Sequence, residues 1–154
     1  MIEINKNTTC AVTGHRKVEF FFNKQALLKK LEQICENGYD TFLVGMALGF
    51  DTLCFKALEK IREKRKIRII ACIPCLEQDK MFNDAQKKEY KKMIESADEK
   101  VVLSPHYTKY CMMQRNRYMV DNSSLLLAYL REEKGGTKNT VKYAEKSGKN
   151  IIII

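Results

Sequence analysis

The sequence has no long hydrophobic run. None of its apolar segments approaches the roughly 20 consecutive residues that a membrane-spanning helix requires. The first residues do not show a basic segment followed by an apolar one, so a secretory signal peptide is not predicted. Internal repeats and low-complexity tracts are also missing from the 154 residues. We therefore expect a cytoplasmic protein that does not associate with membranes and that forms a single domain over residues 1–154.

Two common nucleotide-binding motifs are missing as well. The first predicted strand is followed by one glycine, Gly14, where the dinucleotide-binding fingerprint has three. No segment of the chain shows the glycine-rich pattern of a P-loop, with its lysine and hydroxyl residue. These absences argue against a standard dehydrogenase and against a standard kinase.

Cysteine is present, but its spacing does not predict metal or redox chemistry. Among the six cysteines, Cys72 and Cys75 form a Cys-x-x-Cys pair, and no second pair completes a zinc site. The other cysteines stand in or beside apolar segments, as buried reduced thiols do. We therefore predict no metal ion and no cofactor.

Acidic residues are the minority among the charged residues. The chain has 19 Asp and Glu against 28 Lys and Arg, which gives a formal net charge of +9. This excess of positive charge favours an anionic partner. Many of the basic residues fall in two predicted helices, at residues 56–66 and 87–92, with glutamates interleaved among or beside them. Such a pattern is typical of a solvated helix face, and a groove for nucleic acid is the alternative.

Strand and helix patterns alternate along the chain with little linker between them. Strands are predicted at residues 8–12, 41–44, 68–73, 101–103, 125–130 and 151–154. Apolar residues at helical spacing predict helices between them, and the last helix is predicted to begin near Asn139. This alternation predicts an α/β fold, namely a Rossmann-like, doubly wound, mostly parallel sheet with helices on both faces.

Glycine is scarce, and its distribution points to a site. Five of the seven glycines follow predicted strands: Gly14, Gly45, Gly49, Gly135 and Gly136. The other two, Gly38 and Gly148, fall at predicted helix ends. In a parallel sheet every strand-to-helix loop emerges at the carboxyl edge, where ligands bind. We therefore expect these loops, together with the Pro74 loop and the loop at Ser104 and Pro105, to converge although they are scattered along the sequence.

The glycine pair Gly135 and Gly136 stands between a strand and a helix start. Glycine lets a ligand approach the main chain closely. The first turn of a helix adds unpaired N–H groups and the positive end of the helix dipole. Thr137 and Thr140 contribute hydroxyl groups. Together these features predict an anion site, most naturally one for a phosphate.

Four motifs span nearly the whole chain. They are TGHR at residues 13–16, GMALGFD at 45–51, QRNRYMVD at 114–121 and GGTKNTVKYA at 135–144. In this order they resemble the SLOG superfamily, which groups Smf/DprA proteins with the Lonely Guy phosphoribohydrolases, and especially its YpsA-like branch. The resemblance implies a Rossmann-like fold that binds a nucleotide or a nucleotide-derived ligand.

The candidate ligand-binding residues come from these motifs. They are Thr13, Gly14, His15, Arg16, Gly45, Ala47, Gly49, Asp51, Arg115, Asn116, Gly135, Gly136, Thr137 and Thr140. The guanidinium of Arg115 suits phosphate, and a surface salt bridge is the alternative. Asp51 either caps a helix or accepts a hydrogen bond from a ribose hydroxyl. His15 contacts phosphate, acts as an acid or base, or only makes a local hydrogen bond.

The chain departs from the enzymes of the superfamily after the glycine pair. The phosphoribohydrolases carry glutamates there, and one of them serves cleavage of the N-glycosidic bond. Here the comparable positions hold Thr140, Val141 and Lys142, and the next carboxylate is Glu145. A carboxylate stabilises the oxocarbenium-like state of such a cleavage. The sequence therefore favours binding over catalysis, and we assign no catalytic residue.

We expect a binding module for a phosphate-containing nucleotide derivative, with a sensing, sequestering or regulatory role. ADP-ribose-like signals and nucleoside monophosphates both fit this expectation. One alternative is a hydrolase that cleaves the base–sugar bond of a nucleotide. Another is DprA-like binding of single-stranded nucleic acid by the basic face. A homo-oligomer is compatible with the sequence.

Overall fold

Six short apolar segments form one parallel sheet in the computed structural model, which describes residues 2–154. The strands are β1 (Thr9–Gly14), β2 (Thr41–Val44), β3 (Arg68–Ile73), β4 (Glu99–Val102), β5 (Leu125–Tyr129) and β6 (Asn150–Ile153). Their order in space is β4-β3-β2-β1-β5-β6, and every neighbouring pair is parallel. The central strands are buried on both faces, which is why they read as continuous apolar runs.

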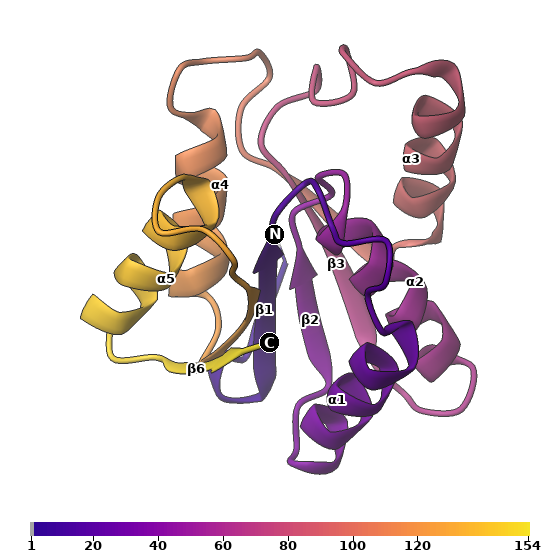
Figure 1. The fold of residues 1–154 in the computed structure, drawn as a ribbon, viewed down its shortest axis with the longest axis vertical. Helices are drawn as coiled ribbons and strands as arrows, with labels where there is room; N and C mark the ends of the chain where they lie inside the picture. The colour runs from indigo at the N-terminus through magenta and orange to yellow at the C-terminus, as the bar shows by residue number, and fades with distance from the viewer. Residues whose placement is uncertain (1) are drawn as a thin grey trace.

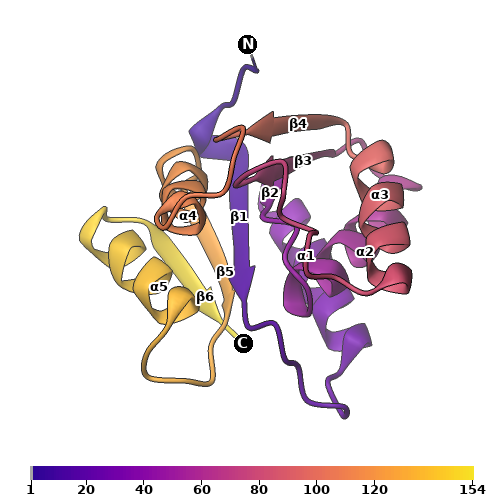
Figure 2. The same cartoon turned by 90° about the horizontal axis from the view of Figure 1, so that it is seen from above.

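Five helices cover the two faces of this sheet. They are α1 (Lys24–Glu36), α2 (Phe50–Arg62), α3 (Asp84–Ser96), α4 (Cys111–Asp121) and α5 (Gly136–Lys146), and a short 3-10 turn, Lys6–Thr8, precedes β1. Helices α1, α2 and α3 lie on one side of the sheet, and α4 and α5 on the other (Figure 1). The view from above shows the same three layers (Figure 2). The predicted Rossmann-like fold with helices on both faces is confirmed.

The hydrophobic core is divided in the same way. One cluster of buried residues joins one sheet face to α1, α2 and α3, and includes Leu31, Phe55 and Tyr90. The other joins the opposite face to α4 and α5, and includes Val120 and Val141. All six cysteines are buried and reduced, as predicted for most of them.

The order of the strands reverses between β1 and β5. From β1 the chain adds β2, β3 and β4 on one side, and then crosses to place β5 and β6 on the other. At such a switch point the neighbouring loops leave in opposite directions and open a crevice at the carboxyl edge.

The last helix begins earlier than predicted. Helix α5 starts at Gly136, with Gly135 as its N-cap at a φ of 107°, whereas the sequence suggested a start near Asn139. The N–H of Asn139 already donates to the carbonyl of Gly135 at 3.0 Å, as the first regular hydrogen bond of the helix. The glycine pair is therefore part of the helix start rather than a loop before it.

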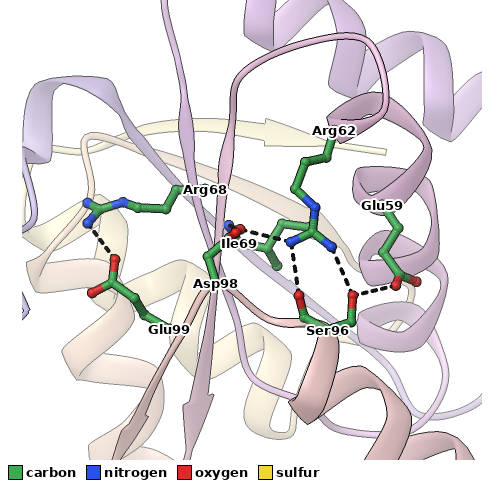
Figure 3. Close-up of polar contacts among 7 residues, drawn as sticks. All are labelled: Glu59, Arg62, Arg68, Ile69, Ser96, Asp98 and Glu99. Atoms are coloured by element: carbon green, nitrogen blue, oxygen red, sulfur yellow. Dashed lines mark hydrogen bonds and ion pairs between the residues drawn. The ribbon is translucent and has the colours of Figure 1, made fainter.

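A polar cluster joins α2, α3 and β4 at the opposite, amino edge of the sheet (Figure 3). Arg62 Nη1 donates to the carbonyl of Ser96 at 3.0 Å and to Asp98 Oδ2 at 2.9 Å. Arg68 Nη1 donates to Glu99 Oε1 at 2.6 Å. These ion pairs neutralise part of the positive charge within the fold.

No helix among residues 2–154 combines the length and the apolar character that crossing a bilayer would require.

Candidate functional site

A cleft of about 1040 Å³ opens at the carboxyl edge, where the loops that follow β1, β2, β3, β4 and β5 converge with α4. All the candidate residues except Gly49 and Thr140 line it. Its volume is at the upper end of the range for small-molecule sites. The structure therefore brings together most of the residues that the scattered motifs suggested.

The glycine pair forms one end of the cleft. Helices α1 and α3 have asparagine N-caps whose side chains accept backbone N–H groups, whereas no side chain caps α5, as is also the case for α2 and α4. A side chain added at Gly136 would meet no heavy atom within 4 Å. Thr137 lines the cleft, but Thr140 Oγ1 donates to the carbonyl of Gly136 at 2.8 Å, inside the helix. The start of α5 thus offers N–H groups and open space.

The other glycines of the edge serve close packing. A Cβ atom at Gly14 would lie 2.5 Å from the ring of Phe50. One at Gly49 would lie 2.1 Å from the backbone oxygen of Arg16, and Gly49 also has a φ of 82°. Gly49 therefore lets the β2–α2 loop pack on the β1–α1 loop instead of lining the cleft.

The β2–α2 loop is strained and anchored. Met46 has a φ of 63°, although it is not a glycine and its side chain is buried. Such backbone conformations persist only where the surroundings hold them, and they cluster at functional sites. The N–H of Phe50 donates to the carbonyl of His15 at 3.1 Å, which fastens the loop to its neighbour.

Asp51 lies in the first turn of α2 and is only 5% exposed. Its Oδ2 accepts the N–H of Ala47 at 3.1 Å. Its Oδ1 is buried and has no hydrogen-bond partner among the described residues. Burial raises the pKa of Asp51 to about 6, against the opposing effects of Arg115 and the Ala47 N–H. The N-cap of α2 is Gly49, so the helix-cap alternative for Asp51 is wrong.

Arg115 projects from α4 across the ends of β2 and β3. Its Nη1 donates to the carbonyls of Gly45 and Cys72, and its Nε donates to Asn116 Oδ1 at 2.8 Å. A Cβ atom at Gly45 would lie 2.7 Å from Nη1, so a glycine is needed beside the guanidinium. Burial lowers the pKa of Arg115, while Asp51 raises it. Because Arg115 is 5% exposed, the surface salt bridge alternative is wrong.

Nη2 of Arg115 remains available to the cleft. Among the described residues its recorded contact is with Met112 Sδ at 4.0 Å, which is a weak acceptor. Arg115 thus forms part of the cleft wall, and its Nε and Nη1 make stronger hydrogen bonds than its Nη2.

His15 makes a local hydrogen bond at the rim of the cleft. Its Nε2 accepts the backbone N–H of Arg131 at 2.8 Å, so a neutral imidazole carries its proton on Nδ1. Its ring packs edge-on against Tyr129 with 5.8 Å between the ring centres. The guanidinium of Arg131 lies 4.4 Å from the centre of the same tyrosine ring.

The β3–α3 loop supplies residues that the sequence did not suggest. Gln78 Nε2 donates to the carbonyl of Gly45 at 2.9 Å, and its Oε1 accepts the hydroxyl of Tyr90 at 2.8 Å. The same loop places Lys80 and Met81 in the cleft lining. The loop itself was expected at this edge after Pro74, but it has no glycine and no periodic pattern, so no sequence signal marked these three residues.

Charges of both signs line the cleft. The basic side chains are Arg16, Lys80, Arg115 and Lys134, and the acidic ones are Asp51, Glu77 and Glu132. Within residues 2–154, no three His, Cys, Asp or Glu side chains come together as a metal site. The site is therefore suited to a ligand with separate anionic and hydrogen-bonding parts.

Comparisons with known proteins agree with this architecture. A model of the YpsA family, described as the YspA SLOG family, matches residues 10–154. Two similar proteins come from Bacillus subtilis (strain 168). The uncharacterized SPbeta prophage-derived protein YoqJ is 33% identical over 140 residues, covering 80% of this chain and 81% of YoqJ. The UPF0398 protein YpsA is 25% identical over 150 residues, covering 88% of this chain and 83% of YpsA.

Two solved structures share the fold. DNA processing protein A (DprA) from Streptococcus pneumoniae has a TM-score of 0.70 and 21% identity, over 96% of this chain and 50% of DprA. DprA from Helicobacter pylori, studied for its single-stranded DNA binding mode, has a TM-score of 0.68 and 19% identity, over 94% of this chain and 64% of DprA. Since the family model covers nearly all of the sequence, the chain belongs to the YpsA-type SLOG family.

Proposed function

We propose that this protein binds a phosphate-containing nucleotide or nucleotide derivative in the cleft, with a phosphate against the main chain of Gly135, Gly136 and Thr137. The observation that carries this proposal is the open space at Gly136. Its φ is not positive, and a Cβ atom added there would meet no heavy atom within 4 Å, so neither the backbone conformation nor close packing at that atom requires a glycine. A missing side chain at an uncapped helix start leaves room for an anion.

The unpartnered oxygen of Asp51 favours a ligand with a sugar in the middle of the cleft. A buried acceptor with no partner is uncommon in folded proteins. A hydroxyl group of a ribose would donate to Oδ1 of Asp51 and satisfy it. Arg115 Nη2 would donate to an oxygen of the same ligand. The proposed ligand thus has a phosphate at α5 and a hydroxyl-bearing sugar over α2.

We further propose that the ligand is bound without cleavage of its glycosidic bond. Val141 is buried in the core against the sheet, and Lys142 is exposed, so neither acts on a sugar at the start of α5. Asp51 is the one buried carboxylate among the described residues of the cleft lining. Binding that stabilises the ground state and the transition state equally gives affinity without acceleration.

Single-stranded nucleic acid is the second candidate ligand. The net charge of +9 and the fold shared with DprA favour it. The mixture of acidic and basic side chains in the cleft, and the ion pairs of Arg62 and Arg68, count against it. We therefore place the nucleotide first.

Calorimetric titration of AMP and ADP-ribose into three proteins tests the proposal. We expect wild type to bind, Gly136→Val to lose at least tenfold in affinity, and Asn139→Val to bind like wild type. Asn139 is the matched control because it is exposed in the same helical turn but does not line the cleft. Equal affinities in all three proteins would place the phosphate elsewhere. Release of free base from either compound, followed by chromatography, would show that the protein is a hydrolase.

A further inference from the structure

Several large apolar side chains are exposed in the segments that border the cleft on the β3 and β4 side. Those exposed in the β3–α3 loop, the β4–α4 loop and the first turn of α4 are Leu76, Met81, Tyr107, Tyr110 and Met113. Met81 is 89% exposed and Tyr107 is 63% exposed, and both line the cleft. Exposed apolar groups that are concentrated at a cleft mark a binding surface.

The two loops that carry these side chains are held in place. The N–H of Tyr107 donates to Glu77 Oε1 at 2.7 Å, which joins the β4–α4 loop to the β3–α3 loop. Gln78 in turn fastens the β3–α3 loop to the floor of the cleft through the carbonyl of Gly45. The backbone is thus anchored while the apolar side chains stay uncovered. The backbone of such a surface loses little freedom when a ligand binds.

These two loops lie at the far end of the cleft from the glycine pair. Strands β1, β2 and β3 stand between β5, which leads to Gly135, and β4, which leads to Tyr107. Four strand spacings correspond to roughly 19 Å at the level of the sheet. One continuous cleft therefore has main-chain N–H groups at one end and an aromatic ring with a thioether at the other. An extended ligand with a phosphate at one end and a flat apolar group at the other matches both.

We propose that Tyr107 and Met81 form the surface on which the base of the nucleotide stacks. This inference rests on the proposed function, because it assigns the second end of the same ligand. Aromatic rings stack on every nucleobase, and the sulfur of methionine makes favourable contacts with aromatic rings. Stacking of this kind adds affinity without choosing one base. The ligand class is therefore a nucleotide with no strict requirement for one base.

Titration of ADP and of inorganic pyrophosphate tests the two ends of the site separately, because pyrophosphate has no base. In Tyr107→Ala we expect ADP to bind roughly tenfold more weakly, since stacking on an aromatic side chain is lost, while the affinity for pyrophosphate is unchanged. Tyr107→Phe should bind both compounds like wild type. Tyr110→Ala is the matched control, because Tyr110 is an exposed tyrosine nearby that does not line the cleft.

Each other outcome contradicts the inference in a recognisable way. If wild type binds ADP and Tyr107→Ala binds it equally well, the base does not stack there and the proposed function stands. If Tyr107→Ala weakens ADP and pyrophosphate equally, Tyr107 supports the loop rather than the base. If wild type binds neither compound, the proposed function fails and the inference fails with it.

Discussion

Asp51 destabilises the folded protein whenever it is ionised. Burial raises its pKa from the ordinary 3.8 to about 6, so the folded state binds a proton more tightly than the unfolded state. Between these two pKa values the contribution of Asp51 to stability falls as the pH rises, and above about pH 7 this loss is complete. We predict that Asp51→Asn is more stable than wild type by up to about 3 kcal/mol at pH 8, with the difference vanishing below pH 4.

Urea unfolding at a series of pH values measures this difference. Asp84→Asn is the matched control, because Asp84 is exposed in the first turn of α3 and its loss should change stability little at any pH. A variant that is less stable than wild type at pH 8 would show that Asp51 is structural. A more stable variant that no longer binds nucleotide would show that the carboxylate is kept for the ligand at the expense of stability.

The roles of single residues were only partly predictable from the sequence. The carboxylate of Asp51 was recognised from its place after a strand, but its unpartnered oxygen depends on the loop that covers it. Arg115 was recognised as a candidate, yet its burial follows from contacts with Gly45 and Cys72, which lie far away in the sequence. Gln78 was missed because its partners, Gly45 and Tyr90, are set by the tertiary structure alone.

Loops and helix starts determine which glycines the fold requires. Gly49→Ala would place a Cβ atom 2.1 Å from the backbone oxygen of Arg16, at a φ of 82°. A backbone atom cannot move aside as a flexible side chain can, so we predict a loss of roughly 3 kcal/mol or more in unfolding free energy. Gly136→Ala serves as the comparison, because the added methyl group meets no atom within 4 Å.

Thermal unfolding of the two alanine variants checks this contrast. Gly49→Ala should melt well below wild type, by roughly 6 °C or more for a chain of this length. Gly136→Ala should melt within a few degrees of wild type. Similar melting temperatures for both variants would mean that the β2–α2 loop can shift away from Arg16 and that its glycine is not required.

Element boundaries were predicted best where strands are buried. The expected strands at 41–44 and 68–73 have the observed limits of β2 and β3, because an uninterrupted apolar run ends where burial ends. The edge strand β4 runs from Glu99 to Val102 rather than over 101–103, since its burial alternates and charged residues take part in it. Helix α5 begins at Gly136 because a glycine at positive φ, and not Asn139, caps it.

At the scale of the whole molecule, the alternation of strands and helices was sufficient to predict one parallel sheet and the edge at which the cleft lies. It did not predict the strand order, on which the position of the β1/β5 switch point depends. The loops rich in glycine and those at Pro74 and Ser104 were therefore predicted to meet, whereas the side chains of Met81 and Tyr107 were not singled out. A chain of six parallel strands brings both kinds of loop to the same edge.

The net charge of the molecule leads to the last prediction, which concerns single-stranded DNA. A charge of +9 should attract any polyanion, but the acidic side chains in the cleft leave no continuous basic groove there. At the opposite edge of the sheet, the ion pairs of Arg62 and Arg68 neutralise part of the positive charge. We therefore expect oligonucleotide binding to be non-specific, with a Kd on the order of 10⁻⁵ M near physiological salt and a steep loss of affinity as salt is raised. Because the contacts would be spread over the surface, Gly136→Val should bind oligonucleotides like wild type.

Fluorescence anisotropy with a labelled oligonucleotide at several salt concentrations measures the Kd and its dependence on salt. Binding that resists salt and is lost in Gly136→Val would place the nucleic acid in the cleft, and would make single-stranded DNA rather than a small nucleotide the ligand of this edge.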